Sequence, residues 1–114
     1  MNASPRPVAL VTGAARRVGA EIARTLHARG ARVAIHYRSS AAAAWSLAAE
    51  LNASRADSAD GFAADLLDLD TLPRLVAAVT ARFGRLDALV APVTVGSWEI
   101  QLRAIAREMG LPCD

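Results

Sequence analysis

Short apolar runs alternate with segments of helical periodicity along most of the chain. Runs of three to five apolar or small residues, several of them bounded by Gly or Pro, are typical of buried parallel strands. Between these runs, apolar residues recur at spacings of three and four, which predicts amphipathic helices. The predicted strands are Val8–Val11, Val33–Ile35, Gly61–Ala64 and Leu86–Val90, and the predicted helices are 18–29, Ala41–Leu51 and 72–83.

Helix stop and start signals support these limits. Gly30 ends the first helix and Gly84 the third, since glycine adopts the left-handed conformation that often closes a helix. Pro73 suits the first turn of the third helix. The apolar face expected for that helix consists of Leu72, Leu75, Val76, Val79 and Phe83.

The second helix follows two serines. Ser39 or Ser40 can cap its amino terminus through the side-chain hydroxyl. We expect Trp45, together with Leu47 or Ala48, to be buried in this helix. The predicted order β-α-β-α-β-α-β favours an α/β fold with a doubly wound parallel sheet of about four strands and right-handed crossovers.

The tail, residues 91–114, has a different character. Residues 91–96 show no clear period, and Ser97 then caps a predicted last helix that stops at Gly110. Its expected apolar face is Trp98, Leu102, Ile105 and Met109. We therefore predict one partial domain over residues 1–114, truncated relative to a full doubly wound sheet and ending in a divergent tail.

Length and composition fit one globular domain. The chain has 114 residues, 54% of them hydrophobic, and a net charge of +2, which excludes a disordered chain. Arginines interrupt every long apolar stretch, so no membrane span is expected, and the first residues do not have the pattern of a secretory signal. The single Cys113 makes neither an internal disulfide nor a metal site. We expect a cytoplasmic protein.

The types of basic residue restrict the chemistry. All 13 basic residues are Arg, the chain contains no Lys, and Tyr37 is the only Tyr. Chemistry that needs a Tyr–Lys pair is therefore excluded within this chain. The small net charge and the dispersed arginines give no indication of nucleic-acid binding, although the isoelectric point is near 9.5.

The turn after the first strand carries the strongest motif, Thr-Gly-Ala-Ala-Arg-Arg-Val-Gly, over residues 12–19. It lies between a predicted strand and a predicted helix, the setting of a Rossmann dinucleotide fingerprint. One glycine allows the tight turn, the other lets helix and strand pack closely, and the helix amino terminus faces the pyrophosphate. The alternative is a βα turn whose glycines serve the backbone alone. The candidate cofactor-binding residues here are Gly13, Arg16, Arg17, Val18 and Gly19.

The end of the second strand indicates which cofactor binds. NAD-binding folds carry an acidic residue there for the ribose 2′-OH, but no acid occurs between Glu21 and Glu50. Arg38 offers a planar guanidinium to a 2′-phosphate, which predicts NADPH or NADP. The alternative makes Arg38 a solvated loop residue. The candidate residues are His36, Tyr37, Arg38, Ser39 and Ser40, of which Ser40 can also be a helix cap, and His36 and Tyr37 can equally be packing residues.

These segments resemble the amino-terminal part of the short-chain dehydrogenase/reductase family. The similarity includes the turn, the Arg-Ser-Ser run, Ala-Asp-Leu at 64–66 and the segment 83–90. Arg17 replaces the middle glycine of the usual Thr-Gly-x-x-x-Gly-x-Gly. With the His-Tyr-Arg-Ser run, this makes the chain similar to the family's pteridine reductases, which use NADPH to reduce biopterin and folate-type rings. The resemblance implies that Asp65 and Leu66 frame the adenine, whereas Asp65 can alternatively cap the polar turn that follows.

The family pattern stops after Val90. The usual Asn-Asn-Ala-Gly is replaced by Ala-Pro-Val-Thr at 91–94, and the Tyr-x-x-x-Lys pair is absent. Three hypotheses follow: an NADPH-dependent reductase acting on a pterin-like substrate but inactive as this chain alone, a non-catalytic NADP-binding module working with a partner, or a structural remnant without ligand. A fragment, a truncated or frameshifted product and an engineered deletion all fit the pattern. We also expect self-association through an exposed sheet edge or the tail helix.

Overall fold

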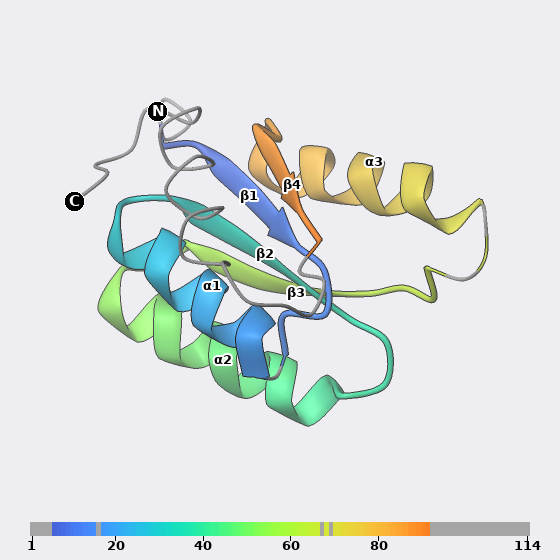
Figure 1. The fold of residues 1–114 in the computed structure, drawn as a ribbon. Helices are drawn as coiled ribbons and strands as arrows, with labels where there is room; N and C mark the ends of the chain where they lie inside the picture. Colours follow the sequence, from blue (N-terminus) through green and yellow to red (C-terminus); the bar gives the residue numbers. More distant parts are fainter. Residues whose placement is uncertain (1–5, 16, 67, 69, 92–114) are drawn as a thin grey trace.

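The computed structural model describes residues 6–15, 17–66, 68 and 70–91. Strands and helices alternate throughout this part of the chain (Figure 1). The order is β1 (Val8–Val11), α1 (Arg17–Ala28), β2 (Arg32–Tyr37), α2 (Ala41–Ser54), β3 (Ala59–Ala63), α3 (Thr71–Phe83) and β4 (Ala88–Val90).

The described strands form one parallel sheet in the order β3-β2-β1-β4. The chain leaves β1 toward β2 and β3 on one side, and then returns to place β4 on the other side of β1. The strand order therefore reverses beside β1, and in open α/β sheets ligands bind at the carboxyl ends of the strands at such a point. The predicted doubly wound α/β fold is confirmed.

Helices cover both faces of the sheet: α1 and α2 lie on one face and α3 on the other (Figure 1). All four residues of β1 are fully buried, as expected of a central parallel strand. Their side chains alternate, so that Ala9 and Val11 pack with α1 and α2, whereas Val8 and Leu10 pack with α3.

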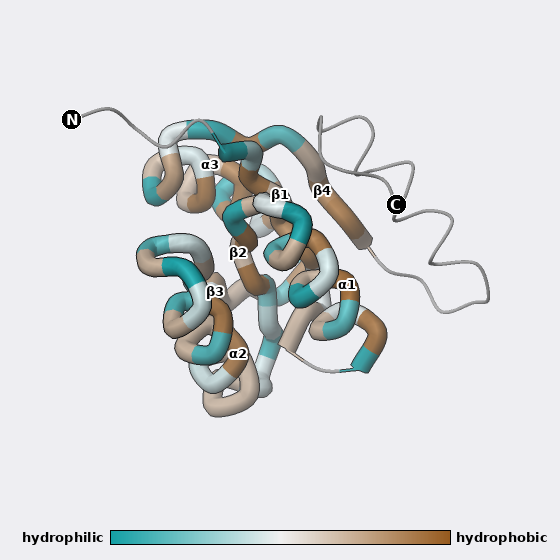
Figure 2. The backbone as a smooth tube through the Cα atoms, turned by 90° about the vertical axis from the view of Figure 1, so that its left-hand side faces the viewer, coloured by the Kyte–Doolittle hydropathy of each residue, from teal (hydrophilic) through white to brown (hydrophobic). Residues whose placement is uncertain are grey.

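The sheet edge at β4 is apolar. Figure 2 shows hydrophobic stretches along β2 and β4. Of the described strands only β1 pairs with β4, and the Leu89 side chain is 46% exposed. None of the described helices is long and apolar enough to cross a membrane.

Three predicted side-chain roles are wrong. Trp45 is 52% exposed because α2 buries Ala44, Leu47, Ala48 and Leu51, and Trp45 projects beside that stripe. Leu72 is also exposed, since the buried stripe of α3 begins one turn later. Ser40 occupies the cap position of α2, but its side chain makes no capping hydrogen bond.

The glycine stops are confirmed. Gly30 and Gly84 both have positive φ, and Gly84 closes α3 with its N–H bonded to the Thr80 carbonyl. The element limits differ from the predictions by a few residues, since α2 continues to Ser54, β3 begins at Ala59 and β4 begins at Ala88. The predicted tail helix and the divergent tail beyond Ala91 lie outside the described residues.

Candidate functional site

The turn after β1 is held between two strands at the carboxyl edge of the sheet. Thr12 donates its backbone N–H to the Val90 carbonyl of β4, and Ala14 donates to the His36 carbonyl of β2, both at 2.9 Å. Gly13 between them has a φ of 61°, and the space where its Cβ would stand is open. A left-handed backbone with an open outer face suits the close approach of a ligand.

Gly19 brings α1 against this turn. A Cβ at Gly19 would lie 2.9 Å from the Ala14 Cα and closer still to the Gly13 carbonyl oxygen. Any side chain at this position would therefore push helix and turn apart. The predicted roles of both glycines, a tight turn and close packing, agree with this geometry.

The amino terminus of α1 follows the turn directly. Its first turn contains no acidic residue, so the partial positive charge of the helix end is not offset locally. Arg17 begins the helix with a φ of 54° and an exposed side chain, and Val18 is 41% exposed. Arg16 lies outside the described residues.

A pocket of about 220 Å³ lies where the turn meets the end of β2. The structure thereby brings together five residues that the sequence predicted, from two segments more than twenty positions apart. Ala15 is not among the predicted site residues, and only its place in the turn indicates that it lines the pocket. The lining residues are Gly13, Ala15, Tyr37, Arg38, Ser39 and Ser40.

Arg38 is the cation among the described residues that line this pocket. Its Nε lies 3.9 Å from Asp65 Oδ1, and the two side chains are 66% and 52% exposed. An ion pair so long and so exposed is weak, so it leaves the guanidinium open to a stronger anionic ligand. Asp65 and the exposed Leu66 follow β3, which places them beside the end of β2.

His36 is not among the residues that line the pocket. It is buried beneath the turn, where the Gly13 N–H donates to its Nδ1 at 2.9 Å. Its Nε2 lies 2.8 Å from the Ala64 carbonyl oxygen. No local sequence pattern predicts these contacts, because they join residues 23 and 28 positions apart.

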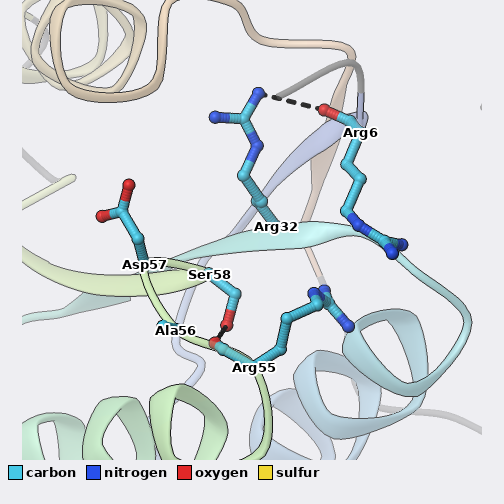
Figure 3. Close-up of a pocket in the computed structure, with 6 residues that line it drawn as sticks. All are labelled: Arg6, Arg32, Arg55, Ala56, Asp57 and Ser58. Carbon is cyan, nitrogen blue, oxygen red and sulfur yellow. Dashed lines mark hydrogen bonds between the residues drawn. The ribbon is translucent and has the colours of Figure 1, made fainter. Parts of the chain in front are cut away.

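A second pocket, of about 120 Å³, lies at the opposite, amino-terminal edge of the sheet (Figure 3). Its arginines bind the carbonyls that end two helices. Arg55 donates to the carbonyls of His27, at the end of α1, and of Ala31, just before β2, and Arg32 donates to the Phe83 carbonyl at the end of α3. Cations at helix carboxyl termini stabilise the fold. These contacts explain the arginines without a ligand.

Among the titratable groups beyond the first pocket, His27 and Asp87 have shifted pKa values. Burial, followed by the charges of Arg55 and Arg6, lowers the pKa of His27 to about 4. Hydrogen bonds from Arg85 and from the Val8 N–H hold the pKa of Asp87 below its usual value. Both groups lie at the amino-terminal edge of the sheet, away from the turn, and therefore affect stability rather than the pocket.

The sequence model of the short chain dehydrogenase family matches residues 7–109, so the family match extends beyond Val90, where the motif pattern was expected to stop. The chain belongs to this family. It is 49% identical over 98 residues to pteridine reductase 1 of Leishmania tarentolae, a match that covers 85% of this chain and 30% of the relative. It is 45% identical over 83 residues to D-threitol dehydrogenase of Mycolicibacterium smegmatis, covering 73% and 31%.

A third relative, versicolorin reductase 1 of Aspergillus parasiticus, is 41% identical over 80 residues, covering 70% of this chain and 30% of the relative. The chain thus spans about a third of the length of these relatives. Family membership implies a nicotinamide dinucleotide cofactor. The site fits such a group, since the turn offers an open backbone face at Gly13 and the described lining of the pocket includes the Arg38 guanidinium and the hydroxyls of Tyr37, Ser39 and Ser40.

Proposed function

We propose that this chain binds NADPH or NADP in preference to NADH or NAD. The observation that supports the preference is the lining of the pocket at the end of β2, which includes Arg38, Ser39 and Ser40 and, among the described residues, no carboxylate. A guanidinium and two hydroxyls are donors for a 2′-phosphate, whereas a 2′-OH is usually bound by an acid at this place. The Ser40 hydroxyl makes no helix-cap bond that would compete.

The remaining candidate residues have complementary roles in this proposal. The pyrophosphate lies against the turn and the amino terminus of α1, where Gly13 and Gly19 allow close approach. Arg17 and Arg16 contribute positive charge from the same helix end, and Val18 lies beside it. Asp65 and Leu66 border the adenine. Tyr37 forms a wall of the adenosine side of the pocket.

We further propose that the reaction is the NADPH-dependent reduction of a pterin-like substrate, and that this chain alone does not catalyse it. Pteridine reductase 1 supports the substrate class by its 49% identity. When bound, NADPH supplies the hydride, while the protein must orient the nicotinamide and deliver a proton. The chain contains no Lys, and its one Tyr lines the adenosine side of the pocket. The Tyr–Lys pair that would supply positioned acid catalysis, worth about 10²–10⁴-fold, is therefore missing from this chain.

The second candidate is a non-catalytic NADP-binding module that works with a partner. The apolar edge at β4, where Leu89 is 46% exposed, favours pairing with another chain or a second copy. Light scattering over a range of concentrations should show a mass that rises with concentration. A stable monomer at every concentration would contradict pairing at this edge.

Charge reversal at Arg38 tests the proposed cofactor preference. In Arg38→Asp, the guanidinium is replaced by a group that repels a 2′-phosphate and accepts from a 2′-OH, so NADPH affinity should fall at least about tenfold and NADH affinity should not. Arg74→Asp is the matched control, because Arg74 is an exposed residue of α3 on the other face of the sheet. Equal losses for both cofactors, or the same loss in the control, would contradict the proposal.

A further inference from the structure

The imidazole of His36 lies beneath the candidate site and makes hydrogen bonds to two of its segments. The ring is 5% exposed and lies between the turn after β1 and the segment that follows β3. Its Nδ1 is 2.9 Å from the Gly13 backbone nitrogen, and its Nε2 is 2.8 Å from the Ala64 carbonyl oxygen. Gly13 shapes the turn, and Ala64 directly precedes Asp65.

The two partners determine which ring nitrogen carries the proton. A backbone N–H can only donate, so Nδ1 must present its lone pair to Gly13. A backbone carbonyl can only accept, so Nε2 must carry the hydrogen and donate it to Ala64. His36 is therefore neutral in this arrangement, with both nitrogens occupied inside the protein.

The charged groups near His36 lie outside this contact. Arg38 and Asp65 follow the ends of β2 and β3, and their side chains are 66% and 52% exposed, whereas the imidazole is buried. The nitrogens of His36 are bonded to backbone groups and to neither of these side chains. The hydrogen bonds of the ring are therefore made to the backbone of the site.

We infer that His36 is a positioning residue, whose Nδ1 fixes the orientation of the Gly13 peptide and so holds the turn in the form that accepts a pyrophosphate. The Gly13 N–H is engaged by the ring, which means that the N–H groups offered to a phosphate come from later in the turn and from the start of α1. Through Ala64 the same ring ties the turn to the adenine side. This inference rests on the proposed function, because it assigns His36 a part in dinucleotide binding without contact with the dinucleotide.

Two amide substitutions separate the two nitrogens. In His36→Asn the side-chain oxygen can take the place of Nδ1 and accept from Gly13, while the bond to Ala64 is lost. In His36→Gln the amide NH₂ can take the place of Nε2 and donate to Ala64, while the acceptor for Gly13 is lost. Each variant loses the imidazole ring and one of its two hydrogen bonds, so each serves as the matched control for the other.

Two measurements on the full chain distinguish a positioning role from a structural one. The first is an NMR experiment on ¹⁵N-labelled protein without cofactor, which detects the scalar coupling between the Gly13 amide nitrogen and His36 Nδ1 across the hydrogen bond, and the amide exchange rate of Gly13. The second is the NADPH dissociation constant. We expect the coupling in the parent, a protected Gly13 amide in the parent and in His36→Asn, and faster exchange in His36→Gln.

We also expect NADPH affinity to stay within about threefold in His36→Asn and to fall about tenfold or more in His36→Gln, which corresponds to one lost hydrogen bond. An absent coupling, or equal behaviour of the two variants in Gly13 exchange, would overturn the inference. If the parent itself fails to bind NADPH, the proposed function is contradicted, and the coupling and exchange data still decide whether His36 fixes the turn.

Discussion

The Asp87 carboxylate accepts a hydrogen bond from the Val8 backbone N–H at 2.8 Å, across 79 positions of sequence. This bond ties the start of β1 to the residue just before β4. Arg85 holds the same carboxylate with two hydrogen bonds, of 2.6 and 2.8 Å. The two strands that flank the reversal of strand order are thus fixed together at their amino-terminal ends, while their carboxyl ends hold the turn of the candidate site.

Replacing Asp87 by Ala should lower the free energy of unfolding by about 1–3 kcal/mol, because the partly buried Val8 N–H loses its acceptor. Asp87→Asn keeps an oxygen for Val8 and should be less harmful. Urea denaturation at pH 7 measures both. An unchanged stability of Asp87→Ala would contradict this role.

The stabilisation from Asp87 should also depend on pH. Because the pKa of Asp87 is lowered in the folded state, its contribution is present above the ordinary Asp pKa of about 3.9 and is lost as the pH falls through the folded value. The stability difference between the parent and Asp87→Asn should therefore shrink below about pH 4. A difference that stays constant between pH 7 and pH 3 would argue against the ionised carboxylate.

Gly19→Ala should disturb both stability and cofactor binding. The added methyl group meets the backbone of Gly13 and Ala14, so the turn or α1 must move, at a cost of about 1–3 kcal/mol. Gly61→Ala is the matched control, since a Cβ there would find its nearest neighbour, the Tyr37 ring, at 3.4 Å. We expect Gly19→Ala to lose NADPH binding and Gly61→Ala to keep it. Equal thermal stability and affinity in both variants would contradict the close packing at Gly19.

His27 predicts a loss of stability in mild acid. Its pKa falls from 6.5 to about 4 on folding, so between these values the unfolded chain binds a proton that the folded chain excludes. Stability should therefore decrease as the pH falls below about 6.5 and level off below about 4, by as much as about 3 kcal/mol. His27→Gln, which can keep a bond to Ser58 Oγ, removes this titration. Urea denaturation between pH 7 and pH 4.5 should show a smaller loss in the variant than in the parent.

Local patterns predicted the fold well, because parallel strands and glycine stops leave strong signals. The apolar run Val8–Val11 is indeed the buried central strand, and Gly84 is indeed the left-handed stop of α3. The predicted burial of Trp45 is wrong because a stripe of alanines and leucines buries α2 against the sheet, and Trp45 lies beside that stripe. In such an alanine-rich helix, the hydrophobicity of a residue does not by itself predict whether its side chain is buried.

The candidate site could be predicted only in part. The pocket residues Arg38 and Ser39 follow from their place at the end of a strand, a feature that can be read locally. The contact of His36 with Gly13 depends on the register between β2 and β1, which places these distant residues together. The family resemblance implies that Asp65 lies near the adenine. Its proximity to Arg38 could not be predicted locally, because it depends on the parallel pairing of β2 and β3.

The preference of this chain for a 2′-phosphate can be measured with two adenosine fragments that lack the nicotinamide half. Isothermal titration calorimetry of the parent chain with 2′,5′-ADP and with 5′-AMP isolates the effect of the 2′-phosphate on binding. We expect 2′,5′-ADP to bind at least about tenfold more tightly, because charge-assisted hydrogen bonds from Arg38 contribute about 1.5–3 kcal/mol. The advantage should shrink at high salt and disappear in Arg38→Met. Equal affinity of the parent chain for the two fragments would contradict the proposed NADPH preference.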